Sequence, residues 1–87
     1  MPQFIQALDN VIAVVRAAGG VPADIATMTA FVTDVAAYRS GARDLGPAWR
    51  ARFGRHFPAM TLVGVTGLVE PGAVVEIQAT AYIGGGP

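Results

Sequence analysis

The chain has 87 residues, and its composition limits the classes of protein to which it can belong. Hydrophobic residues make up 53% of it and charged residues only 14%, against about 25% charged residues in an average soluble domain. Six acidic residues balance six arginines, so the chain has no net charge to attract nucleic acid or anionic lipid. The absence of cysteine excludes disulfides and thiolate metal sites. We therefore predict one small domain over residues 1–87, with more apolar surface than a monomer usually hides.

The apolar runs and the N-terminus favour a cytoplasmic protein. Asp, Arg, Gly or Pro interrupts every apolar run before it reaches the roughly 18 residues of a membrane span. The N-terminus lacks the basic start and apolar stretch of a signal peptide. We expect no membrane partner and no nucleic-acid partner, and the sequence predicts no cofactor and no metal site.

The first predicted element is a helix over residues 3–18, which ends at the glycine pair Gly19 and Gly20. Its apolar side chains recur three and four residues apart, as on one face of a helix, at Ile5, Leu8, Ile12 and Val15. Residues 25–33 are rich in Ile, Thr, Phe and Val, which predicts a strand, and both of its faces are expected to be buried.

A second helix is predicted over residues 35–53, because Thr33 and Asp34 can cap its first amide groups. Pro47 should kink or split this helix, since proline has no amide donor and clashes with the preceding turn. The inner face of the helix is expected to carry Tyr38, Leu45, Trp49 and Phe53.

Two strands are predicted in the last third, over residues 60–65 and 73–83, with a turn at Glu70-Pro71-Gly72 before the second. The last strand alternates strictly, so the side chains of Glu76 and Gln78 face away from those of Val75 and Ile77. We expect it to pair antiparallel with the strand just before it, and we expect a flexible tail over residues 84–87.

These elements predict an α+β fold in the order helix, strand, helix, strand, strand, with both helices on one face of a small sheet. The other face is left uncovered and partly apolar, which favours association with copies of the same chain. The residues expected to be largely buried are Leu8, Ile12, Phe31, Trp49, Phe53, Leu62 and Ile77.

Five segments in this order resemble the RidA family, also called YjgF, the reactive intermediate imine deaminases. They are residues 17–20 (AAGG), 24–25 (DI), 30–34 (AFVTD), 58–63 (PAMTLV) and 75–81 (VEIQATA). The resemblance spans residues 3–83. It implies a chorismate-mutase-like α+β fold assembled as a homotrimer, with clefts between subunits that hydrolyse enamines and imines, such as 2-aminoacrylate, to ketoacids and ammonia.

The chain departs from the family pattern in three ways. Family members usually begin with about 40 residues of β-structure, and the sequence predicts that these N-terminal strands are missing here. Where family deaminases carry an arginine that pairs with the substrate carboxylate, this chain has Met60, whose thioether cannot donate a hydrogen bond to an anion. The region of the second helix is longer than usual, so the family's cleft asparagine has no clear counterpart near Ala42.

The resemblance also implies roles for single residues. Glu76 takes the place of the carboxylate that orients the attacking water, and it could equally be an exposed or ion-paired strand residue. The residues implied to bind the substrate are Met60, its neighbours Ala59 and Thr61, and the loop residues Arg55 and His56. The alternative for His56 is a solvent-exposed loop residue without a ligand. Arg52 or Arg55 could replace the missing guanidinium, and the alternative for both is a solvated helix face.

Two classes of function follow. The first is an enamine or imine deaminase acting on a 2-aminoacrylate-type or aminomuconate-type substrate by adding water, with activity weakened or altered by Met60. The second is a non-catalytic trimer that binds a small molecule or serves as a structural subunit. A ribonuclease is not favoured, because the chain has no net charge and no aromatic-basic pattern.

Overall fold

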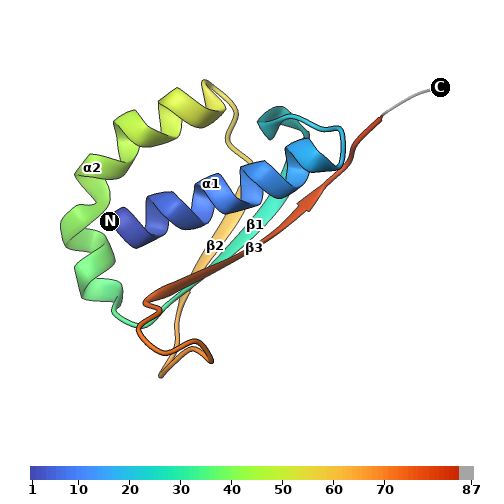
Figure 1. Ribbon diagram of the computed structural model, residues 1–87. Coiled ribbons are helices and arrows are strands. Elements are labelled where there is room, and N and C mark those ends of the chain that lie inside the picture. Colours follow the sequence, from blue (N-terminus) through green and yellow to red (C-terminus); the bar gives the residue numbers. More distant parts are fainter. Residues whose placement is uncertain (85–87) are drawn as a thin grey trace.

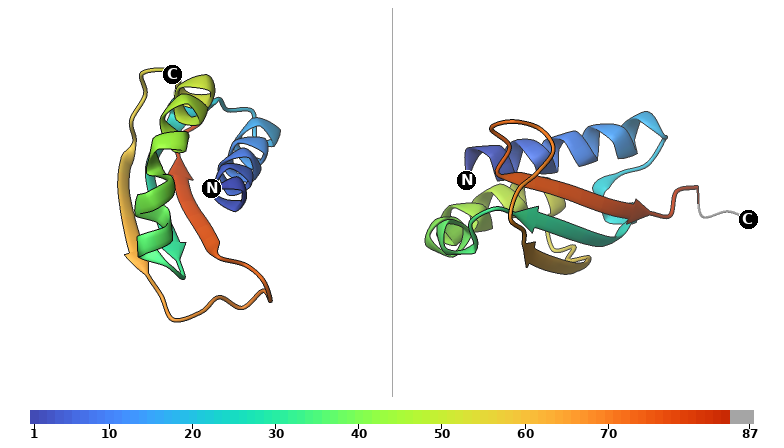
Figure 2. Two further views of the ribbon diagram at one scale, coloured as in Figure 1. Left: turned by 90° about the vertical axis from the view of Figure 1, so that its left-hand side faces the viewer. Right: turned by 90° about the horizontal axis from the view of Figure 1, so that it is seen from below.

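The computed structural model describes residues 1–84 (Figure 1). The helices are α1 (Pro2–Ala17) and α2 (Val35–Phe53), the strands are β1 (Ile25–Val32), β2 (Ala59–Gly64) and β3 (Val75–Ala81), and a 3-10 turn, η1 (Pro22–Asp24), precedes β1. The two helices pack on a mixed three-stranded sheet, which confirms the predicted α+β fold (Figure 2). Most of the predicted flexible tail, residues 85–87, lies outside the described residues. No helix within residues 1–84 is long and apolar enough to cross a membrane.

The strand order is β2-β1-β3, with β1 parallel to β2 and antiparallel to β3. The prediction that the last strand pairs with the one before it is therefore wrong. Hairpins that join neighbouring strands usually use about two to five residues, whereas residues 65–74 form a longer connection. That connection carries the chain past the end of β1, so β3 pairs with the free side of β1 (Figure 1).

Strand β1 buries only one face, so the prediction that both of its faces are buried is also wrong. Met28, Ala30 and Val32 point toward the helices and are at most 4% exposed. Thr27 on the other face is exposed, and Phe31 is half-buried. The reason is geometric, because both helices lie on the same side of the sheet, at its upper left in Figure 1.

Helix α1 packs through Phe4, Leu8, Ile12 and Val15, so its buried stripe begins at Phe4 and not at the predicted Ile5. The amide of Gly20 donates to the carbonyl of Val15 at 2.9 Å, while Gly19 has a φ of 93°, which a residue with a side chain rarely adopts. The predicted glycine stop is thereby confirmed.

Helix α2 begins where predicted, because the Asp34 carboxylate accepts a hydrogen bond from the amide of Ala37 at 3.0 Å. Pro47 lies inside the helix, which stays continuous but changes direction about half-way along in Figure 1. Leu45, Trp49 and Phe53 are buried, as expected, and Tyr38 is half-buried.

The core is centred on aromatic and aliphatic side chains beneath the two helices. The Trp49 and Phe53 rings stack with centroids 4.2 Å apart, and the Phe4 and Tyr38 rings lie 5.3 Å apart. Burial of Leu8, Ile12, Trp49 and Phe53 is confirmed. The prediction that Phe31, Leu62 and Ile77 are largely buried is not confirmed. Leu62 and Ile77 are partly buried beside the core, and Phe31 is half-buried on the uncovered face.

Two polar contacts fix α1 in place. The Gln3 side chain donates to the carbonyl of Gly72 at 3.0 Å and accepts from the amide of Val74 at 2.9 Å, which ties the connection before β3 to the start of α1. The Arg52 guanidinium donates hydrogen bonds to both carboxylate oxygens of Asp9, with Nη2 3.1 Å from Oδ2, and so joins α2 to α1. This hydrogen-bonded arginine lowers the pKa of the Asp9 carboxyl below its usual value.

Replacing Trp49 should destabilise the fold strongly. Trp49 is 8% exposed, and we expect Trp49→Ala to lower the free energy of unfolding by about 3 to 5 kcal/mol, through lost burial and the cavity left behind. Urea unfolding followed by far-ultraviolet circular dichroism measures this change. Tyr82→Ala is the control, because Tyr82 is 74% exposed. A loss below about 1 kcal/mol for Trp49→Ala would contradict the packing described for α2.

The ion pair between Asp9 and Arg52 should make stability fall in acid. Because folding lowers the pKa of Asp9, the pair stabilises the fold above the ordinary carboxyl pKa of about 3.9, and this contribution is lost as the pH falls through the lowered pKa. Asp9→Asn should therefore lower the urea midpoint at pH 7, and its difference from the wild type should shrink as the pH falls below about 3.9. Asp44→Asn, at an exposed position on α2, is the control. Equal effects of Asp9→Asn at pH 7 and below about pH 3.9 would show that the charge contributes nothing.

Candidate functional site

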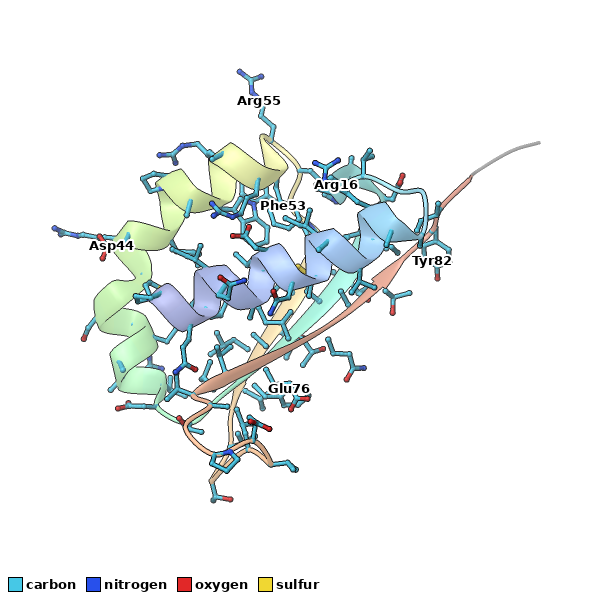
Figure 3. All side chains as sticks on the ribbon, viewed as in Figure 1. Arg16, Asp44, Phe53, Arg55, Glu76 and Tyr82 are labelled. Carbon is cyan, nitrogen blue, oxygen red and sulfur yellow. The ribbon has the colours of Figure 1, made fainter. Side chains whose placement is uncertain are left out.

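The strand register determines which side chains share a face of the sheet. Phe31 lies opposite Val63 of β2 on one side and opposite Glu76 of β3 on the other, so these three form one row across the sheet. The row faces away from both helices, because the alternate residues of β1 carry the buried core. Glu76 therefore stands on the uncovered face, and in Figure 3 it projects from the side of β3 away from α1.

Glu76 also borders a groove between α1 and β3. The groove has a volume of about 600 Å³. Most of its lining is apolar, and besides Glu76 the lining includes Asn10, Val11, Val14, Ile77 and Ile83. Strand β3 is an edge strand and Glu76 is exposed on the uncovered face, so its carboxylate is open to water, whereas most of the groove lining lies on the helix side of β3. An exposed carboxylate can accept a proton from a water molecule that attacks a bound ligand.

Met60 lies on the opposite face of the sheet from Glu76. It pairs with Met28 of β1, which is 2% exposed and faces the helices, so Met60 also points to the helix side. The rows of Met60 and Glu76 are also separated by three residues along β1, or about 10 Å. Within one chain the two side chains therefore cannot contact the same small ligand.

The neighbours of Met60 point the other way. Ala59 and Thr61 are exposed and share the uncovered face with Glu76; Thr61 is in the row of Thr29 and Gln78, next to that of Glu76. The structure thus brings together Glu76, Ala59 and Thr61 on one face and separates them from Met60.

The loop after α2 holds Arg55 and His56 in different settings. The His56 Nε2–H donates to the carbonyl of Ile25, 2.7 Å away, and the backbone carbonyl of His56 accepts from the indole Nε1–H of Trp49 at 3.2 Å. His56 therefore anchors the loop to β1 and leaves only Nδ1 for a ligand. Arg55 is exposed, and in Figure 3 it projects from the opposite end of the molecule to Glu76.

The Arg52 guanidinium is paired with the carboxylate of Asp9, so it is not free to bind an anionic ligand. The groove between α1 and β3 was not anticipated from the sequence. One signal for it was present, since Val14 lies outside the apolar stripe of the first helix and is 70% exposed. Among residues 1–84, no three histidine or acidic side chains come together to hold a metal ion.

Comparison with known proteins identifies the family. The model of the family described as Endoribonuclease L-PSP matches residues 1–83. A member of the YjgF/YER057c/UK114 family from Mycobacterium tuberculosis is 34% identical, with a TM-score of 0.73, over 91% of this chain and 64% of that one. RidA from the Antarctic bacterium Psychrobacter sp. is 32% identical, with a TM-score of 0.73, over 91% of this chain and 60% of that one.

A Rid-family protein from Yersinia pestis is similar at 30% identity, with a TM-score of 0.70, over 87% of this chain and 57% of that one. The chain thus spans between 57% and 64% of the length of these three structures. A search of curated proteins gives no match. The family match covers almost the whole chain, and the structural matches share its fold, so the protein belongs to the YjgF/RidA family.

Proposed function

We propose that the protein is an enamine or imine deaminase of the RidA type, which works in the cytoplasm as a homotrimer on a small-molecule substrate. Membership of the YjgF/RidA family supports this class of reaction. The observation that carries the proposal is the exposed carboxylate of Glu76 on the uncovered face of the edge strand β3.

The reaction needs one water molecule and a group that positions it. The Glu76 carboxylate accepts a hydrogen bond from that water and takes its proton as the oxygen attacks the carbon of the C=N bond. The resulting carbinolamine expels ammonia after its nitrogen is protonated, and a carbonyl group remains. An enamine such as 2-aminoacrylate enters the same route once a proton is added to its methylene carbon. Phe31 and Val63, which share a row with Glu76, offer apolar surface to the carbon skeleton of such a substrate.

Binding of the substrate anion is the weak step. Met60 offers no hydrogen-bond donor at the position proposed to hold the carboxylate, and its neighbours Ala59 and Thr61 contribute one hydroxyl between them. Arg55 and His56 are the other proposed substrate contacts. With this set we expect slow turnover of imino acids and better acceptance of uncharged imines.

The active unit needs more than one copy of the chain. Met60 and Glu76 lie on opposite faces of the sheet, so a substrate can contact both only if they come from different subunits. A cleft between copies, as the family resemblance implies, satisfies this requirement. The uncovered sheet face carries Phe31 and Val63, two apolar side chains that a second copy can cover.

A second candidate function is a non-catalytic trimer that binds a small molecule or serves as a structural subunit. Met60 is the observation in its favour, because an enzyme without its anion-binding group loses affinity for a charged substrate. The two candidates differ in one measurable property, the release of ammonia from an imine.

Restoring a guanidinium should restore activity. We expect Met60→Arg to raise ammonia release from 2-aminoacrylate generated in situ at least about tenfold, since a hydrogen-bonded charge pair contributes about 2 to 5 kcal/mol. The double variant Met60→Arg with Glu76→Gln should release no ammonia above the buffer blank, because it lacks the carboxylate that activates the water. Thr66→Arg adds the same charge at an exposed position after β2 and should change nothing. If no variant releases ammonia above the buffer blank, the deaminase proposal is wrong and the non-catalytic binding or structural role is favoured.

Mixing the chains tests whether the site lies between subunits. Wild-type chains supply Glu76, and chains with both Met60→Arg and Glu76→Gln supply the guanidinium. After the two are refolded together from urea, we expect activity well above that of either alone, because some clefts then combine Arg at position 60 with Glu76. Activity equal to the average of the two parents would mean that both residues must belong to one chain, which would contradict the proposed cleft.

A further inference from the structure

A second cavity lies on the outer side of the fold, remote from Glu76. It is formed by the second half of α2 and the loop that follows, and its volume is about 320 Å³. Its main lining residues are Leu45, Gly46, Trp49, Arg50, Arg55 and Phe57. It shares no lining residue with the groove between α1 and β3.

Two aromatic rings give this cavity a flat apolar wall. The Trp49 and Phe57 rings are nearly parallel, at 7°, with their centroids 6.3 Å apart. Trp49 is held in place, because it stacks on Phe53 and its indole N–H donates to the carbonyl of His56. Phe57 is 72% exposed. Covering such an exposed aromatic ring with another ring is favourable, because it removes apolar surface from water.

The rim of the cavity is positively charged. Arg50 and Arg55 line it, and its lining contains no acidic residue. Within residues 1–84 the only ion pair joins Asp9 and Arg52, so neither rim arginine has a carboxylate partner. The Arg50 guanidinium lies close to Gly46, with Nη1 3.5 Å from where a β-carbon at Gly46 would be.

We propose that this cavity binds a small aromatic carboxylate, with its ring against Trp49 and Phe57 and its anion on Arg50 and Arg55. A flat aromatic wall selects a planar ring, and guanidinium groups match the two oxygens of a carboxylate. A volume of about 320 Å³ admits a single-ring acid. The cavity lining holds no carboxylate or other general base, so this is a binding site separate from the proposed deaminase reaction. It gives Arg55 this ligand in place of the substrate contact that the family resemblance implies.

Trp49 is the only tryptophan of the chain, so its fluorescence reports directly on the cavity. The probe is phenylacetate, and the matched neutral compound is 2-phenylethanol. We expect phenylacetate to change the Trp49 emission saturably, with a dissociation constant in about the millimolar range, and 2-phenylethanol to bind at least about fivefold more weakly. Equal affinity for both compounds, or no saturable change, would overturn the proposal.

Variants locate the binding site. Arg55→Gln and Arg50→Gln should each weaken phenylacetate binding at least about fivefold, and Phe57→Ala should weaken both compounds. Arg43→Gln, on the same helix but outside the cavity lining, should bind as wild type does. Arg55 is in an exposed loop, so its substitution keeps the test valid even if Arg50→Gln fails to fold.

One more variant separates this proposal from the deaminase. Glu76→Gln should abolish any deamination and leave phenylacetate binding unchanged, because Glu76 does not line this cavity. Loss of binding in Glu76→Gln together with retention in Arg55→Gln would place the ligand in the groove between α1 and β3 and refute the second site.

Discussion

The packing of Met28, Ala30 and Val32 against the two helices is the interaction on which the other elements depend. Each of these side chains is at most 4% exposed, and β1 pairs with both other strands. Strand β1 is consequently the centre of the sheet, with β2 joined to it in parallel through α2 and β3 antiparallel on its other side. Because two helices can cover only one face of a sheet, burial of this face leaves the opposite face open.

The open face determines how the protein can function. Period-two alternation places Glu76 on that face and Met60 on the covered one, at rows about 10 Å apart along β1. A single chain therefore offers an exposed carboxylate on the open face but no partner group there that could hold the far end of a substrate. The proposed assembly of several chains would meet both needs, since it would cover Phe31 and Val63 and bring residues of different copies together.

Much of the fold could be predicted because the deciding signals are local. The Asp34 cap, the stop at Gly19 and the alternation of β3 each depend on neighbouring residues, and all three are present in the structure. The pairing of β3 with β1 could not be predicted in this way, because alternation shows which residues share a face but not which strand lies alongside. The same limit explains Phe31, whose apolar character fits a core position as well as an interface between chains.

The candidate site was predictable to a smaller extent. A motif match could suggest Glu76, but only the register shows that Met60 faces the other way. From the sequence alone, Arg52 and Arg55 were equally good candidates to bind an anion. The structure distinguishes them, because Arg52 forms an ion pair with Asp9, whereas Arg55 lines a cavity with Trp49. Contacts between residues as distant in sequence as Asp9 and Arg52 depend on how α1 and α2 pack, which no local pattern encodes.

The central claim is that the functional unit is built from several chains joined through the open face of the sheet. The most direct measurement is the mass in solution by light scattering at micromolar concentration, for the wild type and for Phe31→Arg. The account predicts three times the 9.0 kDa chain mass for the wild type and a smaller assembly for Phe31→Arg, in which a charge interrupts the apolar contact. A wild-type mass equal to one chain would contradict it.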